Sequence, residues 1–289
     1  MLIWDARQSA VSLVAALLLC ALLWLLVYEA GLPAVHWLWP PLVAGGFYYG
    51  MMRRLLRRRR LLRQPFPEAW RALLRERVDY YTSLPPDEQA AFEMDVQLFL
   101  AEHRVTGVGV EVTDLLRLLV ASSAVMLTFG WPDWEYDNVP EVLIYPRSFS
   151  EEYDTSCPGK RRPLSGMVVP QGAVILSAPD LIESFAGEDF YHVGVHEFAH
   201  LLDMEGWESD GVPKNLHPRL RKKWVSVLRN ELDRARRGES LLRDYAGENL
   251  AECFAVAAEC FFKTPLDLRD YDPLLYEMLA SYFNQDVAE

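Results

Sequence analysis

The segment His196-Glu197-Phe198-Ala199-His200 holds the residues best suited to chemistry in this chain of 289 residues. It has the pattern H-E-x-x-H, and on a helix residues i and i+4 lie one turn apart on the same face. Two imidazoles placed in this way can bind one zinc ion, and Glu197 can take a proton from a water molecule that the ion activates. The pattern predicts the active site of a zinc peptidase.

The surrounding composition favours a metal site over a surface helix with two unrelated histidines. Three of the six histidines, His192, His196 and His200, lie within nine residues. Apolar residues flank them, so we expect this helix to be largely buried: Val193, Val195, Phe198, Leu201 and Leu202. Burying a glutamate without a partner is costly, and a nearby cation would stabilise Glu197 in such a place.

A zinc peptidase needs a third protein ligand, because the fourth position is left to water. Residues 249–263 are rich in Ala and Phe and have helical periodicity, and Asn249 is suited to cap the N-terminus of this helix. Glu252 and Glu259 are seven residues apart, so they share one face of the helix. We interpret Glu252 as the ligand and Glu259 as a carboxylate that orients an imidazole N–H. For either glutamate, the alternative is a position facing water at the edge of the helix.

These segments also resemble a known family, the MtfA family of zinc peptidases. That family is also described as the Mlc (DgsA) anti-repressor family, and it is distantly similar to the catalytic domain of anthrax lethal factor. The resemblance covers roughly residues 66–286 and rests on the segments GVHEFAHLLD at 194–203, DGVP at 210–213, Tyr245 with AECFAV at 251–256, GVEVTD at 109–114, LIYP at 143–146 with Phe149, and GAVILS at 172–177.

The resemblance implies a role for each matching site residue. It implies that His196, His200 and Glu252 bind Zn²⁺ and that Glu197 is the general base. It also implies that Tyr245, seven residues before the glutamate ligand, donates its hydroxyl to the tetrahedral oxyanion. The expected activity is hydrolysis of a peptide bond by a zinc-activated water.

Two residues depart from the family pattern. Cys253 stands where the family usually has Phe, and His192 stands where it tends to have Asn. Since His192 and His200 would be about 12 Å apart along a helix axis, one ion can hardly take both together with His196. We interpret both departures as packing residues, with a position behind the ligands or beside the substrate as the alternative for His192.

The N-terminal region has the features of a membrane anchor. Residues 11–28 are eighteen residues without a charge, which is long enough for a transmembrane helix. A second uncharged segment, residues 32–52, contains Pro40 and Pro41, which are expected to kink it, so a re-entrant or interfacial position is the alternative to a second span. A cleaved signal peptide is disfavoured because no clean A-x-A site follows the apolar run.

The charges predict which side of the membrane the rest of the chain occupies. A polybasic flank, residues 53–63, contains seven arginines, and the positive-inside rule places it in the cytoplasm, against anionic lipid. Residues 1–64 carry a net charge of +6, which leaves −18 on the remaining residues. A domain this acidic is not expected to bind nucleic acid, and a basic or neutral partner suits it better than an acidic one. We therefore expect a bacterial-type inner-membrane protein with its catalytic domain in the cytoplasm.

The expected architecture is an α+β fold, a mostly helical zincin-type metallopeptidase domain with a small sheet over residues 65–289, preceded by a transmembrane helix or helical hairpin within residues 1–64. Helices are expected over residues 68–82, 86–103, 113–129, 188–204, 217–236, 249–263 and 273–283. The helix over 217–236 is basic and amphipathic, and we interpret it as a solvated face. Short strands are expected at 143–145, 167–169 and 173–176, the last two forming a hairpin that either binds substrate along its edge or serves only the core. The cysteines Cys20, Cys157, Cys253 and Cys260 show no C-x-x-C pairing and are expected to be reduced thiols.

Two functions are compatible with these features. The first is a membrane-anchored, cytoplasm-facing zinc peptidase acting on a peptide or protein substrate. The second is a weakly catalytic or non-catalytic binding protein that sequesters a transcriptional repressor, Mlc-like or another regulator, at the membrane. The presence of both Glu197 and Tyr245 favours the first, because binding alone requires neither.

Overall fold

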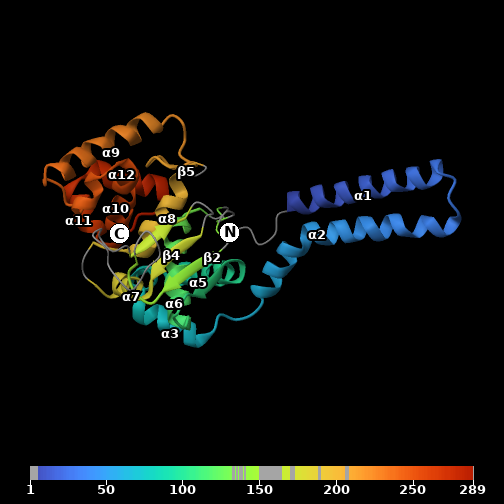
Figure 1. The fold of residues 1–289 in the computed structure, drawn as a ribbon, viewed down its shortest axis with the longest axis horizontal. Helices are drawn as coiled ribbons and strands as arrows, with labels where there is room; N and C mark the ends of the chain where they lie inside the picture. The colour runs from blue at the N-terminus through green and yellow to red at the C-terminus, as the bar shows by residue number, and fades with distance from the viewer. Residues whose placement is uncertain are drawn as a thin grey trace. The chain divides into compact units, whose positions relative to one another are not determined.

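The computed structural model describes residues 6–131, 134, 136, 139, 141–149, 165–169, 173–187, 190–205 and 208–288. It divides into two compact units, Met1–Pro65 and Phe66–Glu289, and each is described by itself. Helices dominate both units and a small mixed sheet lies in the second, so the predicted α+β fold class is confirmed (Figure 1).

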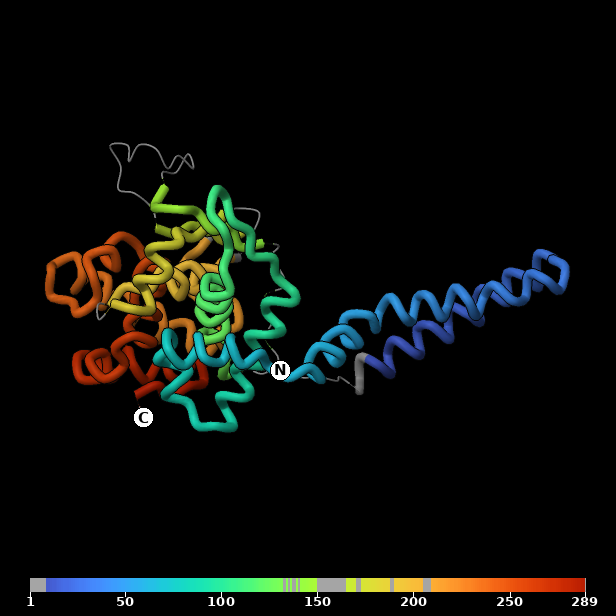
Figure 2. Tube along the Cα trace, turned by 90° about the horizontal axis from the view of Figure 1, so that it is seen from below, coloured from blue at the N-terminus to red at the C-terminus, as the bar shows by residue number. Residues whose placement is uncertain are grey.

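The first unit is a helical hairpin. Helix α1 (Ala6–Glu29) and helix α2 (Trp39–Leu61) run side by side, joined by the short 3-10 helix η1 (Ala34–Leu38) (Figures 1 and 2). Within the described residues, one helical stretch, Ser9–Glu29, is long and apolar enough to cross a membrane. The kink expected at Pro40 and Pro41 is wrong, because both prolines lie in the first turn of α2, where no backbone N–H is needed.

The sheet of the second unit has four strands in the order β1-β2-β4-β3. Strands β1 (Arg104–Gly107), β2 (Glu141–Tyr145) and β4 (Val174–Ser177) are parallel. Strand β3 (Gly166–Val168) pairs antiparallel with β4, with Val168 opposite Val174. This pairing confirms the predicted hairpin. The turn at residues 170–172 lies outside the described residues, and so does Cys157.

The helices of the second unit follow the prediction at most positions. Their bounds are α3 Glu68–Arg77, α4 Asp79–Ser83, α5 Pro86–Glu102, α6 Asp114–Thr128, α7 Ala178–Ala186, α8 Val193–Asp203, α9 Arg221–Arg236, α10 Leu250–Lys263, α11 Pro265–Tyr271 and α12 Pro273–Phe283. Two short strands, β5 (Met204–Glu205) and β6 (Glu208–Ser209), follow α8, and the 3-10 helix η2 (Asp244–Gly247) precedes α10. Three expectations are corrected: the helix over 68–82 is interrupted at Val78, which is extended, while α8 begins at Val193 rather than 188 and α9 at Arg221 rather than 217.

The core is built around α6, α8 and α10. Helix α8 packs against α6, α10 and the strands β3 and β4, so it is enclosed between the sheet and the C-terminal helices. Helix α10 is buried at every position from Cys253 to Phe262. Aromatic rings extend this core toward α12: Phe254, Phe261 and Phe262 of α10 all contact Phe283. The two helices that carry the candidate ligands therefore lie in the core of the unit.

Candidate metal centre

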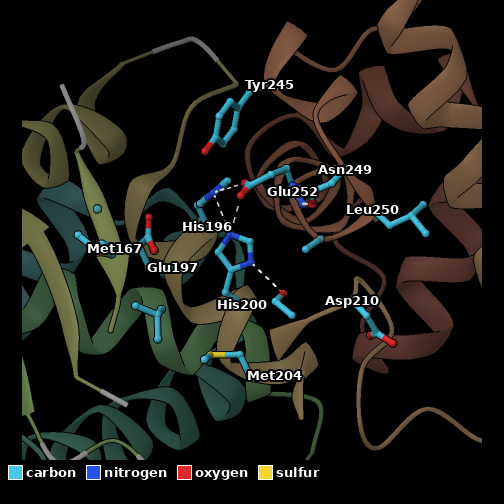
Figure 3. A pocket seen from close by; sticks show the side chains of 14 residues that line it. Met167, His196, Glu197, His200, Met204, Asp210, Tyr245, Asn249, Leu250 and Glu252 are labelled. Atoms are coloured by element: carbon cyan, nitrogen blue, oxygen red, sulfur yellow. Dashed lines mark hydrogen bonds and ion pairs between the residues drawn. The ribbon is translucent and has the colours of Figure 1, made fainter. Parts of the chain in front are cut away.

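Helices α8 and α10 bring three candidate ligand atoms together at the point where they meet (Figure 3). The Nε2 atoms of His196 and His200 are 3.2 Å apart. Glu252 Oε2 lies 3.1 Å from His196 Nε2 and 3.4 Å from His200 Nε2. The residues occupy consecutive turns of α8 and the first turn of α10, where Asn249 Oδ1 accepts a hydrogen bond from the Glu252 N–H and caps the helix. The spacing read from the sequence thus produces a compact cluster of two imidazoles and one carboxylate.

The geometry of this cluster fits a tetrahedral zinc ion. Ligand distances of 2.0–2.1 Å place any two ligand atoms of a tetrahedral zinc site about 3.3 Å apart, close to the three separations observed. Glu252 Oε2 is buried and has no hydrogen-bond partner within the described residues. A buried carboxylate oxygen that faces two nitrogen lone pairs requires a cation or a proton between them.

The other nitrogen of each imidazole is held by a second group, which directs Nε2 toward the cluster. His196 Nδ1 lies 2.6 Å from Oε1 of Glu259, so it carries the proton and donates it to this carboxylate. His200 Nδ1 lies 3.4 Å from the hydroxyl of Ser209, which in turn donates to Asp203. A carboxylate behind each histidine is the arrangement that fixes the tautomer of metal-binding histidines. It also agrees with the role suggested for Glu259 from its position on α10.

The electrostatics of the cluster favour positive charge. Burial lowers the pKa of His196, but the carboxylates of Glu259 and Glu252 raise it by more, to about 10. Burial raises the pKa of Glu252, but the adjacent imidazoles of His196 and His200 outweigh this effect and hold the pKa well below its usual range. Both shifts mean that the folded chain stabilises a cation at this point, as a metal site requires.

Glu197 lies beside the cluster and is not part of it. Its side chain is buried at the foot of the cleft, next to strand β3. Burial raises the pKa of Glu197, and the charges of His196 and His200 oppose the rise. A raised pKa makes this carboxylate a stronger base than a solvent-exposed one, as suits a general base.

The close approach of β3 to Glu197 requires a glycine. A Cβ atom added at Gly166 would lie 2.4 Å from Glu197 Oε1 and 2.5 Å from its Cγ. Strand β3 therefore covers Glu197 and holds its side chain toward the cleft (Figure 3).

Tyr245 lies on η2 above His196, with the two ring centroids 5.8 Å apart. Its hydroxyl points into the cleft (Figure 3). Burial raises the pKa of Tyr245, so the hydroxyl keeps its proton at neutral pH and can donate it.

Arg243 is a site residue that sequence analysis did not identify. Its guanidinium pairs with Glu259 and lies over the rings of Tyr191 and Tyr245, at 4.8 and 5.6 Å from their centroids. Arg243 thus links the carboxylate behind His196 to the tyrosine of the cleft. It stands in a loop with no periodicity, two residues before Tyr245, so only that proximity could have indicated it.

His192 does not belong to the ligand cluster. It caps α8, because its Nδ1 accepts a hydrogen bond of 3.2 Å from the Val195 N–H. Its own N–H donates to Glu259 Oε2 at 2.7 Å, and its ring packs against Phe185. Cys253 faces away from the cluster and is buried near Leu228, whose carbonyl lies 3.6 Å from its sulfur.

The cluster opens into a cleft of about 510 Å³. Strand β3 forms one wall and the loop before α10, with its first turn, forms the other (Figure 3). The lining residues are Gly166, Met167, Val168, His196, Glu197, His200, Met204, Ser209, Asp210, Tyr245, Asn249, Leu250, Ala251 and Glu252. Every candidate catalytic and ligand residue expected from the sequence therefore borders the same cleft.

Comparison with known proteins gives matches over most of the chain. The family model described as "Glucose-regulated metallo-peptidase M90" matches residues 52–284. An uncharacterized protein of Synechocystis sp. is 29% identical over 241 residues, which cover 77% of this chain and 86% of the relative. Mlc titration factor A of Klebsiella pneumoniae is 30% identical over 225 residues, covering 70% of this chain and 81% of the relative. The protein of that name from Yersinia enterocolitica is 29% identical over 239 residues, covering 75% and 85%.

Proposed function

The chain belongs to the glucose-regulated metallo-peptidase M90 family, and from this premise we propose that it is a membrane-anchored, cytoplasm-facing zinc peptidase. The match confirms the resemblance to MtfA-like proteins found in the sequence. The observation that carries the proposal is the meeting of His196 Nε2, His200 Nε2 and Glu252 Oε2, no more than 3.4 Å apart, beside Glu197 in one cleft.

The residues of the cleft supply each part of a hydrolytic mechanism. His196, His200 and Glu252 would hold the zinc ion, which would supply a water of lowered pKa and polarise a carbonyl group. Glu197 accepts the proton of the attacking water, a step that its raised pKa favours. It later passes this proton to the leaving nitrogen. The Tyr245 hydroxyl donates a hydrogen bond to the carbonyl oxygen as negative charge develops there.

Strand β3 gives the cleft a way to align an extended peptide. In the described part of the chain β3 lies at the edge of the sheet, and Gly166, Met167 and Val168 line the cleft. An extended peptide can pair with such an edge through backbone hydrogen bonds. This would place its carbonyl groups beside the ligand cluster.

The N-terminal hairpin supports the anchoring part of the proposal. The 24 residues of α1 span about 36 Å, enough for the hydrocarbon core of about 30 Å. Large apolar side chains of α1 are exposed in the hairpin, including Leu17, Leu18 and Leu22. Six of the seven arginines of residues 53–63 lie in α2 beyond its apolar part, where anionic lipid on the cytoplasmic side would attract them.

The first test of the proposal is peptide hydrolysis by the full-length chain in detergent. We expect turnover of a broad fluorogenic peptide library with zinc, loss of turnover after chelation, and recovery on adding zinc back. Glu197→Gln should lower kcat by roughly 10²–10⁴-fold while zinc content stays at that of the parent, because the base is lost and the ligands remain. Glu183→Gln, at an exposed position of α7, is the control. A parent protein that binds zinc and cleaves no peptide would refute the peptidase.

A second candidate function follows from the name of the relatives. Several are called Mlc titration factor A, which suggests that this chain sequesters a transcriptional regulator of the Mlc type. The variant Glu197→Gln distinguishes the two functions. It should lose peptide hydrolysis, whereas sequestration of a regulator should persist because it does not require a general base.

A further inference from the structure

The segment that leads into α9 carries charge opposite to that of the rest of its unit. Residues 211–230 contain six lysines and arginines and no aspartate or glutamate, whereas residues 65–289 together carry −18. All six of these side chains are exposed: Lys214, Arg219, Arg221, Lys222, Lys223 and Arg229. A concentration of positive charge on so acidic a unit creates a local potential that attracts acidic groups.

An apolar hollow of about 230 Å³ lies within this basic surface, between the start of α9 and helix α12. Leu216, Leu220, Trp224, Met278 and Tyr282 supply its apolar wall, and Lys223, Glu277 and Ser281 complete the lining. Leu220 is 46% exposed, so a large apolar side chain faces solvent at its rim. A hollow of this kind can take one inserted side chain, which is how a short peptide segment is anchored.

The wall of the hollow is held in place from behind. Trp224 is 1% exposed, and its Nε1 donates a hydrogen bond of 2.7 Å to the carbonyl of Gly211. The Tyr282 hydroxyl donates to Asn215 Oδ1 at 2.8 Å and so ties α12 to the segment before α9. A preformed wall reduces the entropy lost when a partner binds.

We propose that this α9–α12 hollow, with the basic residues around it, docks an acidic segment of a partner protein through one large apolar anchor residue. The anchor fills the hollow, and flanking aspartates and glutamates lie against Arg219 and Lys223. The charge complementarity carries the choice of partner, since residues 211–230 carry six basic and no acidic residues in a unit whose net charge is −18. The proposal concerns a surface separate from the metal cleft and does not depend on peptidase activity.

A protein segment fits this surface better than an anionic membrane does. The headgroup layer of a membrane is polar and presents no apolar side chain that could fill the hollow. Anionic lipid would also repel Glu277, which lines the hollow. A folded or extended peptide can present its acidic residues to the lysines and arginines while it keeps them away from Glu277.

The test measures binding of a fluorescein-labelled peptide, a central phenylalanine flanked by aspartates and glutamates, to the full-length chain in phosphatidylcholine nanodiscs. We expect saturable binding by fluorescence anisotropy that weakens as salt rises. Arg219→Glu/Lys223→Glu should weaken binding at least about tenfold, and Leu220→Ser should weaken it by a similar factor. The matched control, Arg104→Glu/Arg117→Glu, makes the same change of charge at exposed positions of β1 and α6 and should bind as the parent does.

Three outcomes would overturn the proposal. The first is equal binding by the parent and by Arg219→Glu/Lys223→Glu. The second is equal affinity for a peptide with serine in place of phenylalanine, which would leave only nonspecific charge attraction. The third is displacement of the peptide, at matched ionic strength, by glycerophosphoglycerol, the soluble headgroup of phosphatidylglycerol, which would identify a lipid headgroup as the occupant. Glu197→Gln leaves this surface unchanged, so we expect it to bind the peptide as the parent does. The binding test therefore distinguishes failure of this proposal from failure of the proposed peptidase activity.

Discussion

A single buried carboxylate, Glu259, organises the metal centre at the level of residues. It accepts from His196 Nδ1, from the backbone N–H of His192 and from Arg243. The ligand tautomer, the start of α8 and the guanidinium beside Tyr245 thus depend on one side chain. Removing a buried acceptor leaves each of its donors unsatisfied, so we expect these three features to be lost together.

His192 gives the fold a predictable response to acid. Burial lowers the pKa of His192 to about 3, against 6.5 for the unfolded chain, and its Nε2 has no hydrogen-bond partner within the described residues. Between these values the unfolded state binds a proton that the folded state does not, so this group destabilises the fold as pH falls from 6.5 toward 3. His192→Asn keeps a side chain that can cap α8 and removes the titration.

The expected result is a difference in unfolding free energy that depends on pH. Relative to the parent, His192→Asn should gain about 1.4 kcal/mol per pH unit below pH 6.5, on top of a constant loss from the smaller side chain. Urea unfolding of the zinc-free proteins from pH 4.5 to 8 measures this. His217→Asn, at an exposed position, should run parallel to the parent. A difference between His192→Asn and the parent that does not change with pH would contradict the account.

The candidate site could be expected from sequence at some residues only. The i, i+4 and i, i+7 spacings indicated His196, His200, Glu252 and Glu259, because helical periodicity places the residues of each pair on one face of their helix. Arg243 and Ser209 reach the site through contacts between separate segments of the chain, which no local pattern reports, whereas Asp203 ends α8 only three residues after His200. Resemblance to a family was needed to assign Tyr245.

At the scale of elements, the position of β3 over α8 controls the general base. Gly166→Ala puts a methyl group where Glu197 now lies, so the carboxylate must move or the strand must withdraw. Since misplacement of a catalytic group by about 1 Å costs on the order of 10²-fold, kcat should fall by that order while zinc binding is retained. Gly50→Ala, where the added methyl meets nothing within 4 Å, is the control. A kcat equal to that of the parent in Gly166→Ala would show that the added methyl group does not displace the Glu197 carboxylate.

Helix ends marked by a capping residue or a proline could be predicted from the sequence, whereas breaks between helices that tertiary packing imposes could not. Asn249 caps α10 and Pro273 opens α12, and both helices lie within one residue of the expected bounds. The apolar pattern runs through Val78 without interruption, so nothing local indicates that α3 ends there and α4 begins. Helix α7 was missed because its nine residues directly follow β4 with no intervening loop.

At the scale of the whole molecule, averages of charge and hydropathy conceal the surfaces that matter. The net charge of −18 suggested a basic or neutral partner, yet residues 211–230 contain six lysines and arginines and no acidic residue. Likewise, a hydropathy value near zero (−0.02) combines a very apolar α1 with a charged second unit. Each feature becomes visible only when the chain is divided into its elements.

The anchoring role of α1 predicts how the chain divides between membrane and soluble fractions. Leu18→Arg/Leu22→Arg adds two charges near the middle of Ser9–Glu29, at a cost of about 5–7 kcal/mol for insertion. The parent should stay in bacterial membranes through an alkaline carbonate wash, and this variant should appear in the supernatant. Met51→Arg/Leu56→Arg, with Met51 just before the polybasic flank and Leu56 within it, should behave as the parent, because long side chains there can reach the headgroups. Release of the parent protein by the carbonate wash would contradict the membrane-anchoring part of the proposed function.

The seven-residue spacing of Glu252 and Glu259 on α10 has a consequence for changes of chain length. One residue inserted between them would turn Glu259 by about 100° and displace it by about 1.5 Å, while the helix itself could remain intact. The ligand would stay in place and the carboxylate behind His196 would point elsewhere. Insertions and deletions are therefore excluded between these two glutamates even where substitutions are tolerated, whereas the exposed turn around Gly238, which ends α9, has room for added residues.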